Sequence, residues 1–287
     1  TYLHIDGTPK INCVYGSGNG DYDYSDRSSL DAGPVCHFEY TEVTPLQESV
    51  FIDINTEGGM IDTVFGGGNG VGVQNNVEIL FNSKVPNTLT VGTIFGGNNR
   101  ENMESCVPDI ILTQGTVKNV FGGGNSGSMN GSDEFTDVCG EAVTGVSTYV
   151  TVNTDKVTIT GSLFGGCRMA DVRGMAYIDI RNTQAGGINY VYGGNDISGD
   201  VGTELGEGSY AVIDHKAVVL QSVYGGSNGL YHCSKNGRYL GGDAYLLKDR
   251  QGKVGDPHDE YANLLVPTHN NTNLYLNGGK VLYSAYG

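Results

Sequence analysis

A short phrase that recurs along the chain limits what this sequence can fold into. It reads VYGSGNG at residues 14–20, VFGGGNG at 64–70 and VFGGGNS at 120–126. An aromatic residue followed by glycine marks the same point of eight copies: Tyr15, Phe65, Phe95, Phe121, Phe164, Tyr192, Tyr224 and Tyr286. A recurring phrase of this kind is typical of repeat architectures, in which equivalent residues of successive repeats stack on one another.

Three further columns accompany the aromatic residue. The residue just before it is aliphatic in all eight copies, and we expect it in the interior, with the rings stacked at a corner; the alternative is the reverse arrangement. Four residues before the aromatic stand Ile11, Ile61, Val91, Val117, Thr160, Ile188, Leu220 and Leu282. Asparagine follows three or four residues later at Asn19, Asn69, Asn98, Asn125, Asn195 and Asn228. We expect the asparagines to bond the backbone at a turn and the glycines to supply positive φ at a sharp bend.

A second apolar segment lies upstream of each aromatic residue, for example VFIDIN, YVTVN and AYIDI. Apolar and polar residues alternate in these segments, which is the pattern of a strand with one buried face. No stretch has a helical period. Each repeat is therefore predicted to contain two strands, a turn between them and a Gly-Gly corner.

The spacing of the aromatic residues indicates the architecture. The short intervals are 26–32 residues, close to the length of one turn of a solenoid and too short for a propeller blade. We predict an all-β chain that forms a parallel β-solenoid, a right-handed single-stranded β-helix with about eight coils. Residues 1–287 would form one array, a fragment of a longer repeat region with neighbouring repeats or caps outside this chain.

Three intervals are longer than one coil, and the extra residues lie near 21–45, 126–147 and 229–270. Insertions at one point of a repeat project from one side of a solenoid, which is often the binding face. The candidate ligand-binding residues are tyrosines and one arginine, whose flat groups stack while their polar ends bond: Tyr22, Tyr24, Tyr231, Arg238, Tyr239 and Tyr245. The alternative is that these segments are solvated loops.

Charge limits the partners and cofactors. The chain has 32 Asp plus Glu against 16 Lys plus Arg, a net charge of −16, which disfavours nucleic acid. No apolar run reaches the length of a membrane span. Asp21, Asp23 and Asp26 are candidate ligands for one calcium ion, and otherwise form a solvated acidic loop. No other cofactor is expected.

The six cysteines do not form a C-x-x-C pair, so a zinc site is not expected. An even number permits disulfides, and Cys13 with Cys36 and Cys106 with Cys139 would each close an irregular segment. The other interpretation is that they are buried free thiols.

The stretch GTVKNVFGGGNSG at 115–127 resembles the glycine-rich VFGGGN repeats of large secreted or surface proteins of gut bacteria. Those proteins are described as adhesin-like and are expected to form β-helices. The resemblance covers about eight repeats and implies a secreted or cell-surface location. It implies no catalytic residues.

The leading hypothesis is a non-catalytic, adhesin-like repeat protein that binds glycan or protein through loops on one side. A β-helix polysaccharide lyase or glycoside hydrolase is the alternative, with Asp53, Asp179 and Asp214 as carboxylates on the first strand of the repeat. These aspartates lie on the polar side of regular strands, where a surface aspartate is ordinary. A third alternative is a structural spacer.

Overall fold

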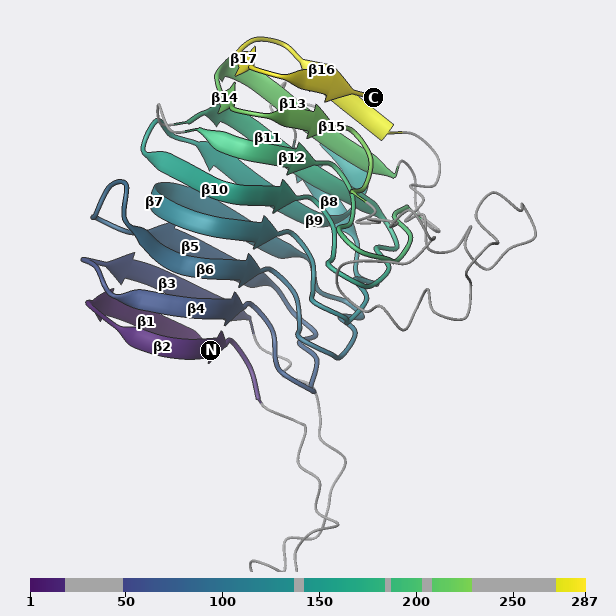
Figure 1. Cartoon of the computed structure of the whole chain (residues 1–287). Coiled ribbons are helices and arrows are strands. Elements are labelled where there is room, and N and C mark those ends of the chain that lie inside the picture. The colour runs from purple at the N-terminus through teal and green to yellow at the C-terminus, as the bar shows by residue number, and fades with distance from the viewer. Residues whose placement is uncertain (19–48, 137–141, 184–186, 203–207, 229–271) are drawn as a thin grey trace, which may run out of the picture.

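The computed structural model describes residues 1–18, 49–136, 142–183, 187–202, 208–228 and 272–287. Every regular element in this part of the chain is a strand, which confirms the all-β prediction. The strands form one curled sheet, and all strand pairs except β8–β9 are parallel (Figure 1). The N-terminal and C-terminal strands lie at opposite ends of the stack.

Two ladders of parallel strands make up the sheet. The first ladder contains β1 (Tyr2–Gly7), β3 (Val50–Thr56), β5 (Val77–Asn82), the first half of β7 (Pro108–Phe121), β9 (Ala142–Asn153), β11 (Met175–Asn182), β13 (Ser209–Lys216) and β16 (Thr272–Leu276). The second contains β2 (Lys10–Tyr15), β4 (Met60–Phe65), β6 (Leu89–Phe95), the second half of β7, β10 (Val157–Phe164), β12 (Ile188–Tyr192), β14 (Val218–Val219), β15 (Ser222–Tyr224), β17 (Lys280–Val281) and β18 (Ser284–Tyr286). We call one strand of each ladder, with the loop that follows, a rung.

The inner faces of both ladders share one apolar core. Strand β3 alternates buried and partly exposed residues along its whole length, as expected for a strand with one face in the core. Ile52, Ile79 and Ile110 lie side by side in the first ladder, and all three are fully buried. In the second ladder the residue before the aromatic fills the equivalent place, as at Val64 and Ile94. Like residues therefore pack above like residues in the interior.

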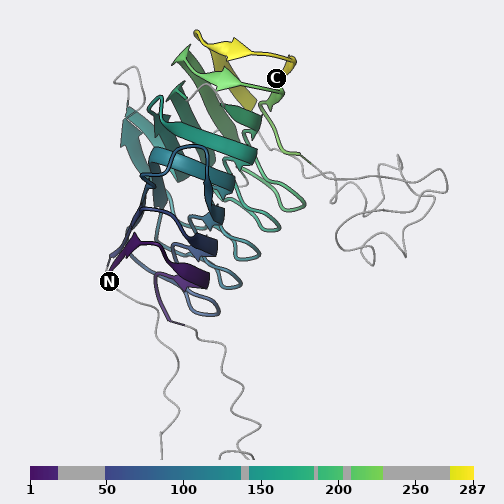
Figure 2. The same ribbon diagram turned by 60° about the vertical axis from the view of Figure 1, so that its left-hand side comes forward.

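The described loops after the Gly-Gly corners complete the core. Four apolar residues from successive loops, Met103, Met129, Val172 and Val201, are fully buried and joined by single parallel bridges. Figure 2 shows these loops stacked on one side of the two ladders. The loops therefore cover the open side of the curled sheet.

The column four residues before the aromatic was assigned wrongly in three copies. The structure places Ile159, Val219 and Val281 in line with Ile188, in place of Thr160, Leu220 and Leu282. Each of these rungs has one extra residue between the column and the aromatic, and an extra residue reverses the face on which the upstream side chains lie. Leu282, for example, is 59% exposed, whereas Val219 is fully buried.

The corner glycines are needed for a different reason from the one expected. None of the residues Gly16, Gly66, Gly96, Gly122, Gly165, Gly193 and Gly225 has a positive φ. A Cβ built on Gly96 would instead overlap the carbonyl oxygen of Gly122 in the next rung, and Gly66 stands in the same relation to Gly96. Glycine is required here because adjacent rungs approach too closely for any side chain.

The insertion near 126–147 is described in part. Strand β8 (Asp133–Thr136) pairs antiparallel with the first residues of β9, so the described part of this extra length lies beside the first ladder. The insertions near 21–45 and 229–270 lie entirely outside the described residues. The described part contains no helix long and apolar enough to cross a membrane.

Candidate functional site: a groove along the aromatic row

The eight aromatic residues form a continuous stack, which we call the aromatic row. Neighbouring ring centroids are 4.7–5.1 Å apart and neighbouring ring planes are within 14° of parallel. Phe121 and Phe164 are each only 3% exposed, so the rings show little more than an edge to solvent. Stacked pairs at these distances contribute about 0.5–1.5 kcal/mol each beyond the area that they bury. The row therefore stabilises the corner of every rung.

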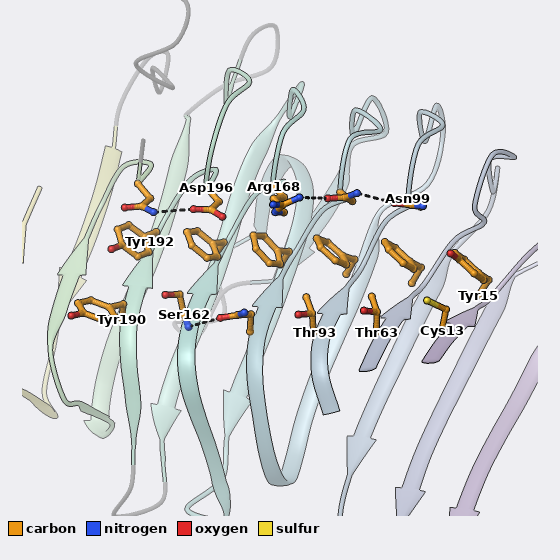
Figure 3. Close-up of a pocket in the computed structure, with 17 residues that line it drawn as sticks. Cys13, Tyr15, Thr63, Thr93, Asn99, Ser162, Arg168, Tyr190, Tyr192 and Asp196 are labelled. Atoms are coloured by element: carbon orange, nitrogen blue, oxygen red, sulfur yellow. Dashed lines mark hydrogen bonds between the residues drawn. The ribbon is translucent and has the colours of Figure 1, made fainter. Parts of the chain in front are cut away.

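A groove of about 670 Å³ follows the aromatic row from Tyr15 to Tyr192 (Figure 3). One wall comes from the residues two before the aromatic, which we call the upstream row: Cys13, Thr63, Thr93, Asn119, Ser162 and Tyr190. The other wall comes from the residues four after the aromatic, which we call the downstream row: Asn99, Asn125, Arg168, Asp196 and Asn228, with Asn69 next in line. The groove thus has a floor of ring edges between two polar walls.

Hydrogen bonds join the downstream row from rung to rung. Nδ2 of Asn99 donates to Oδ1 of Asn69 at 2.6 Å, and Nδ2 of Asn125 donates to Oδ1 of Asn99 at 2.8 Å. The guanidinium of Arg168 then donates to Oδ1 of Asn125 at 3.2 Å. A ladder of this kind holds each amide in one orientation.

The single asparagine column expected from the sequence separates into two rows. Asn98 and Asn195 stand three residues after their aromatics, and both are fully buried. Oδ1 of Asn98 accepts from the backbone of Gly68, and its Nδ2 donates to the Glu101 carbonyl. Asn69, Asn125 and Asn228 belong to the downstream row, and Asn19 lies outside the described residues. Turn bonding is thus the role of the inner asparagines, and the outer ones form the groove wall.

Two charged residues of the groove were not identified as site residues from the sequence. Arg168 interrupts the asparagine pattern, and its position four residues after Phe164 was the signal that could have placed it in the wall. Asp196 occupies the next place in the row and is 7% exposed. Burial raises the pKa of the Asp196 carboxyl, while the hydrogen bond from Asn228 and the charge of Arg168 act in the opposite direction. Burial also raises the pKa of Tyr192 to about 12.

Most of the predicted site residues lie outside the described part of the chain. These are the ligand-binding candidates Tyr22, Tyr24, Tyr231, Arg238, Tyr239 and Tyr245, and the calcium candidates Asp21, Asp23 and Asp26. Among the residues that are described, no cluster of three or more His, Cys, Asp or Glu side chains could hold a metal ion.

The cysteines that the structure describes are free thiols. Cys36 and Cys139, the other halves of the two disulfides considered from the sequence, lie outside the described residues. Cys13 is exposed at the groove, and Cys106 and Cys167 are buried. Burial raises the pKa of the Cys106 and Cys167 thiols to about 12. A buried cysteine of this kind behaves as a small apolar residue.

The three aspartates considered for hydrolysis do not face one another. Asp53 pairs with His4 and Leu80 in the first ladder, and His4 Nδ1 lies 2.8 Å from its Oδ2. Asp179 lies four rungs away in the same line, about 19 Å along the ladder at the usual strand spacing. Asp214 instead contacts its neighbour His215.

A different pair of carboxylates lies on the first ladder, outside the groove. Glu78 and Asp109 are partners on adjacent strands β5 and β7. Burial, and then the charge of Glu78, raise the pKa of Asp109 to about 7. Oδ1 of Asp109 is buried without a hydrogen-bond partner in the described part of the chain.

Comparison with known proteins adds nothing to this geometry. A scan against protein-family models, a search of curated proteins and a search of solved structures each found no match.

Proposed function

We propose that the chain is one run of a right-handed parallel β-solenoid with about eight coils over residues 1–287, and that it binds a linear polymer along the groove without cleaving it. Two parallel ladders with like residues in register support a solenoid. Connections between parallel strands of one sheet are right-handed in about 98% of cases, which supports the handedness.

The groove is the observation that carries the binding function. It spans six aromatic residues, and its walls supply hydroxyl or amide groups at most rungs, with one guanidinium at Arg168 and one carboxylate at Asp196. A polymer lying lengthwise would therefore meet hydroxyl or amide groups at most steps. The resemblance of the repeat to adhesin-like proteins supports a secreted or cell-surface location, and the net charge of −16 disfavours a nucleic acid as the polymer.

Such a polymer would contact side chains of the groove and not backbone groups. The strands beside the groove pair with the rungs above and below them, so their backbone groups are already bonded. A peptide that binds by strand addition needs a free sheet edge, and the groove runs across the strands. We place the binding function at this groove; the insertions near 21–45 and 229–270 lie outside the described residues.

One observation favours hydrolysis as a second candidate. An acid with a raised pKa beside another carboxylate is the arrangement that glycoside hydrolases use, and Asp109 and Glu78 have it. Asp109 Oδ1 is buried, however, and the pair lies outside the groove. Binding is therefore the better supported function, and a spacer that binds nothing is the outcome if the test below fails.

A groove-filling variant tests the proposal. Thr93 lies in the middle of the upstream row, and Thr93→Tyr would place a ring across the groove. Thr151→Tyr is the matched control, because Thr151 is also half-buried on a strand but belongs to the first ladder. The measurement is retention by gels containing soluble polysaccharides and by immobilised mucin, which offers both glycan and protein.

We expect the native protein and Thr151→Tyr to be retained, and Thr93→Tyr to bind at least tenfold more weakly. Equal retention of Thr93→Tyr and Thr151→Tyr would show that the polymer does not bind in the groove. If the native protein binds none of these polymers, the binding function itself is wrong. Release of reducing sugar that stops in Asp109→Asn would establish hydrolysis instead.

A further inference from the structure

One residue of the groove wall is much larger than its neighbours. The upstream row consists of small side chains as far as Ser162, and the next place is taken by Tyr190. Tyr190 is 36% exposed, whereas the rings of Phe121 and Phe164 in the aromatic row are 3% exposed. The Tyr190 ring therefore contributes little to the core and is accessible from the groove.

The orientation of Tyr190 makes one of its ring faces available. Its centroid is 6.3 Å from that of Tyr192, and the two ring planes differ by 25°. Tyr192 is stacked between Phe164 and Tyr224, so the faces of Tyr190, like those of the aromatic row, look along the groove. The residue beside Tyr190 on the preceding rung is Ser162, whose side chain ends in a single oxygen and does not cover a ring.

Ser162 lies beside Tyr190 in Figure 3, and Asn119 lines the groove on the rung before Ser162. We call the space between Tyr190, Ser162 and Asn119 the slot. Oδ1 of Asn119 accepts a hydrogen bond from the backbone N–H of Ser162 at 3.0 Å. Within the described part of the chain, Nδ2 of Asn119 and the hydroxyl of Ser162 have no hydrogen-bond partner. Asn119 and Tyr190 are two rungs apart, about 9.6 Å at the usual strand spacing, which leaves room for one ring between them.

We propose that this slot receives a single pyranose ring of the bound glycan, either its chain end or a one-residue branch, while the main chain of the polymer follows the groove. The inference rests on the proposed binding function and names the ligand class of the same groove. A pyranose has an apolar face, which would stack on Tyr190, and a rim of hydroxyls, which would bond Asn119 and Ser162. A phenyl side chain from a peptide would bury the same amide and hydroxyl without partners, which is costly.

Three variants test the slot on a glycan array, followed by calorimetry with the oligosaccharide that binds best. Tyr190→Ala removes the ring and Tyr190→Phe keeps it, while Ser162→Tyr fills the slot with a ring of the protein itself. Tyr275→Ala is the matched control, because Tyr275 is an exposed tyrosine on the first ladder at 41%. Thermal unfolding of each variant establishes that it is folded.

We expect Tyr190→Ala to bind about tenfold more weakly, the loss of one stacking contact. Ser162→Tyr should abolish binding, and Tyr190→Phe and Tyr275→Ala should bind like the native protein. The array positions that bind should share one terminal or branching sugar.

Native-like binding by Tyr190→Ala and Ser162→Tyr, with weak binding by Thr93→Tyr, would overturn the slot and leave the groove function intact. Binding to the protein part of mucin with no bound glycan would also overturn the slot. If the native protein binds neither glycan nor mucin, the proposed function fails with it.

Discussion

Replacing Phe121 by alanine should be among the most destabilising changes in the aromatic row. Its ring lies 4.7 Å from Phe95 on one side and 4.7 Å from Phe164 on the other, and it is 3% exposed. A buried Phe→Ala change costs about 3–5 kcal/mol, because apolar area is lost and a cavity remains. Two stacking contacts are lost as well, so we expect a value in the upper half of that range.

Tyr15 provides the internal comparison. It has one ring partner in the aromatic row, Phe65 at 5.1 Å, and it is half-buried, so Tyr15→Ala should cost about 1–2 kcal/mol. Phe121→Leu restores apolar volume without the flat ring, so its cost in unfolding free energy should lie between those of Phe121→Ala and Tyr15→Ala.

Urea unfolding followed by far-ultraviolet circular dichroism measures all three free energies of unfolding, provided that the dependence on urea concentration is unchanged. A cost for Phe121→Ala no greater than that for Tyr15→Ala would refute the reasoning, because the row would then not stabilise the rungs that it joins.

Three further predictions follow from packing and charge. Gly96→Ala should cost at least about 2 kcal/mol in thermal unfolding because its Cβ would overlap the Gly122 carbonyl, and Gly18→Ala, which meets only a side chain at 3.3 Å, should cost less than half as much. The pKa of Asp109 is raised to about 7 from 3.8, so its contribution to stability is complete below about pH 4 and is lost as the pH rises through 7. Asp109→Asn should therefore weaken the fall in unfolding free energy between about pH 4 and 7, and an unchanged fall would show that another group is responsible. With Cys36, Cys139 and Cys233 replaced by serine, a thiol reagent should modify one cysteine, Cys13, in the native protein and three in urea; rapid labelling of all three without urea would contradict the burial of the other two.

The residues that repeat most closely were the ones whose place the sequence could predict. The position before the aromatic, as at Val64 and Ile94, is aliphatic in every copy, and the aromatic rings that follow are similar in size and shape. A single register of the strands therefore places aliphatic residues beside aliphatic residues and rings beside rings. The alternation in β3 likewise indicated which of its residues are buried.

The details that could not be predicted depend on a shift of one residue. Asn98 and Asn99 are adjacent, yet one bonds the backbone inside the corner and the other forms the groove wall. Residue type alone does not separate these roles, because asparagine suits both. The extra residue between Val219 and Val223 was hidden for the same reason, since Val219 and Leu220 are both aliphatic and either could fill the column.

The groove was missed because no local pattern records it. Its walls come from residues two before and four after the aromatic, and they meet only when six rungs are stacked. The sequence drew attention to long insertions instead, since insertions are visible as irregular spacing. Arg168 stands where other copies of the repeat have asparagine, so the sequence indicated an interruption of the pattern. Its hydrogen bond to Asn125 nevertheless places it in the downstream wall of the groove.

The central claim is that successive rungs stack along one axis, and a distance between the two ends of the upstream row tests it most directly. Cys13 stands on the first rung and Ser284 on the last, with seven strand spacings between them. Spin labels on Cys13 and on Ser284→Cys, with Cys36, Cys139 and Cys233 replaced by serine, give this distance by pulsed electron resonance. Stacked rungs predict a narrow distribution centred near 34 Å, seven times about 4.8 Å. A distance below about 20 Å, or a broad distribution without a peak, would contradict the stack on which both the groove and the slot depend.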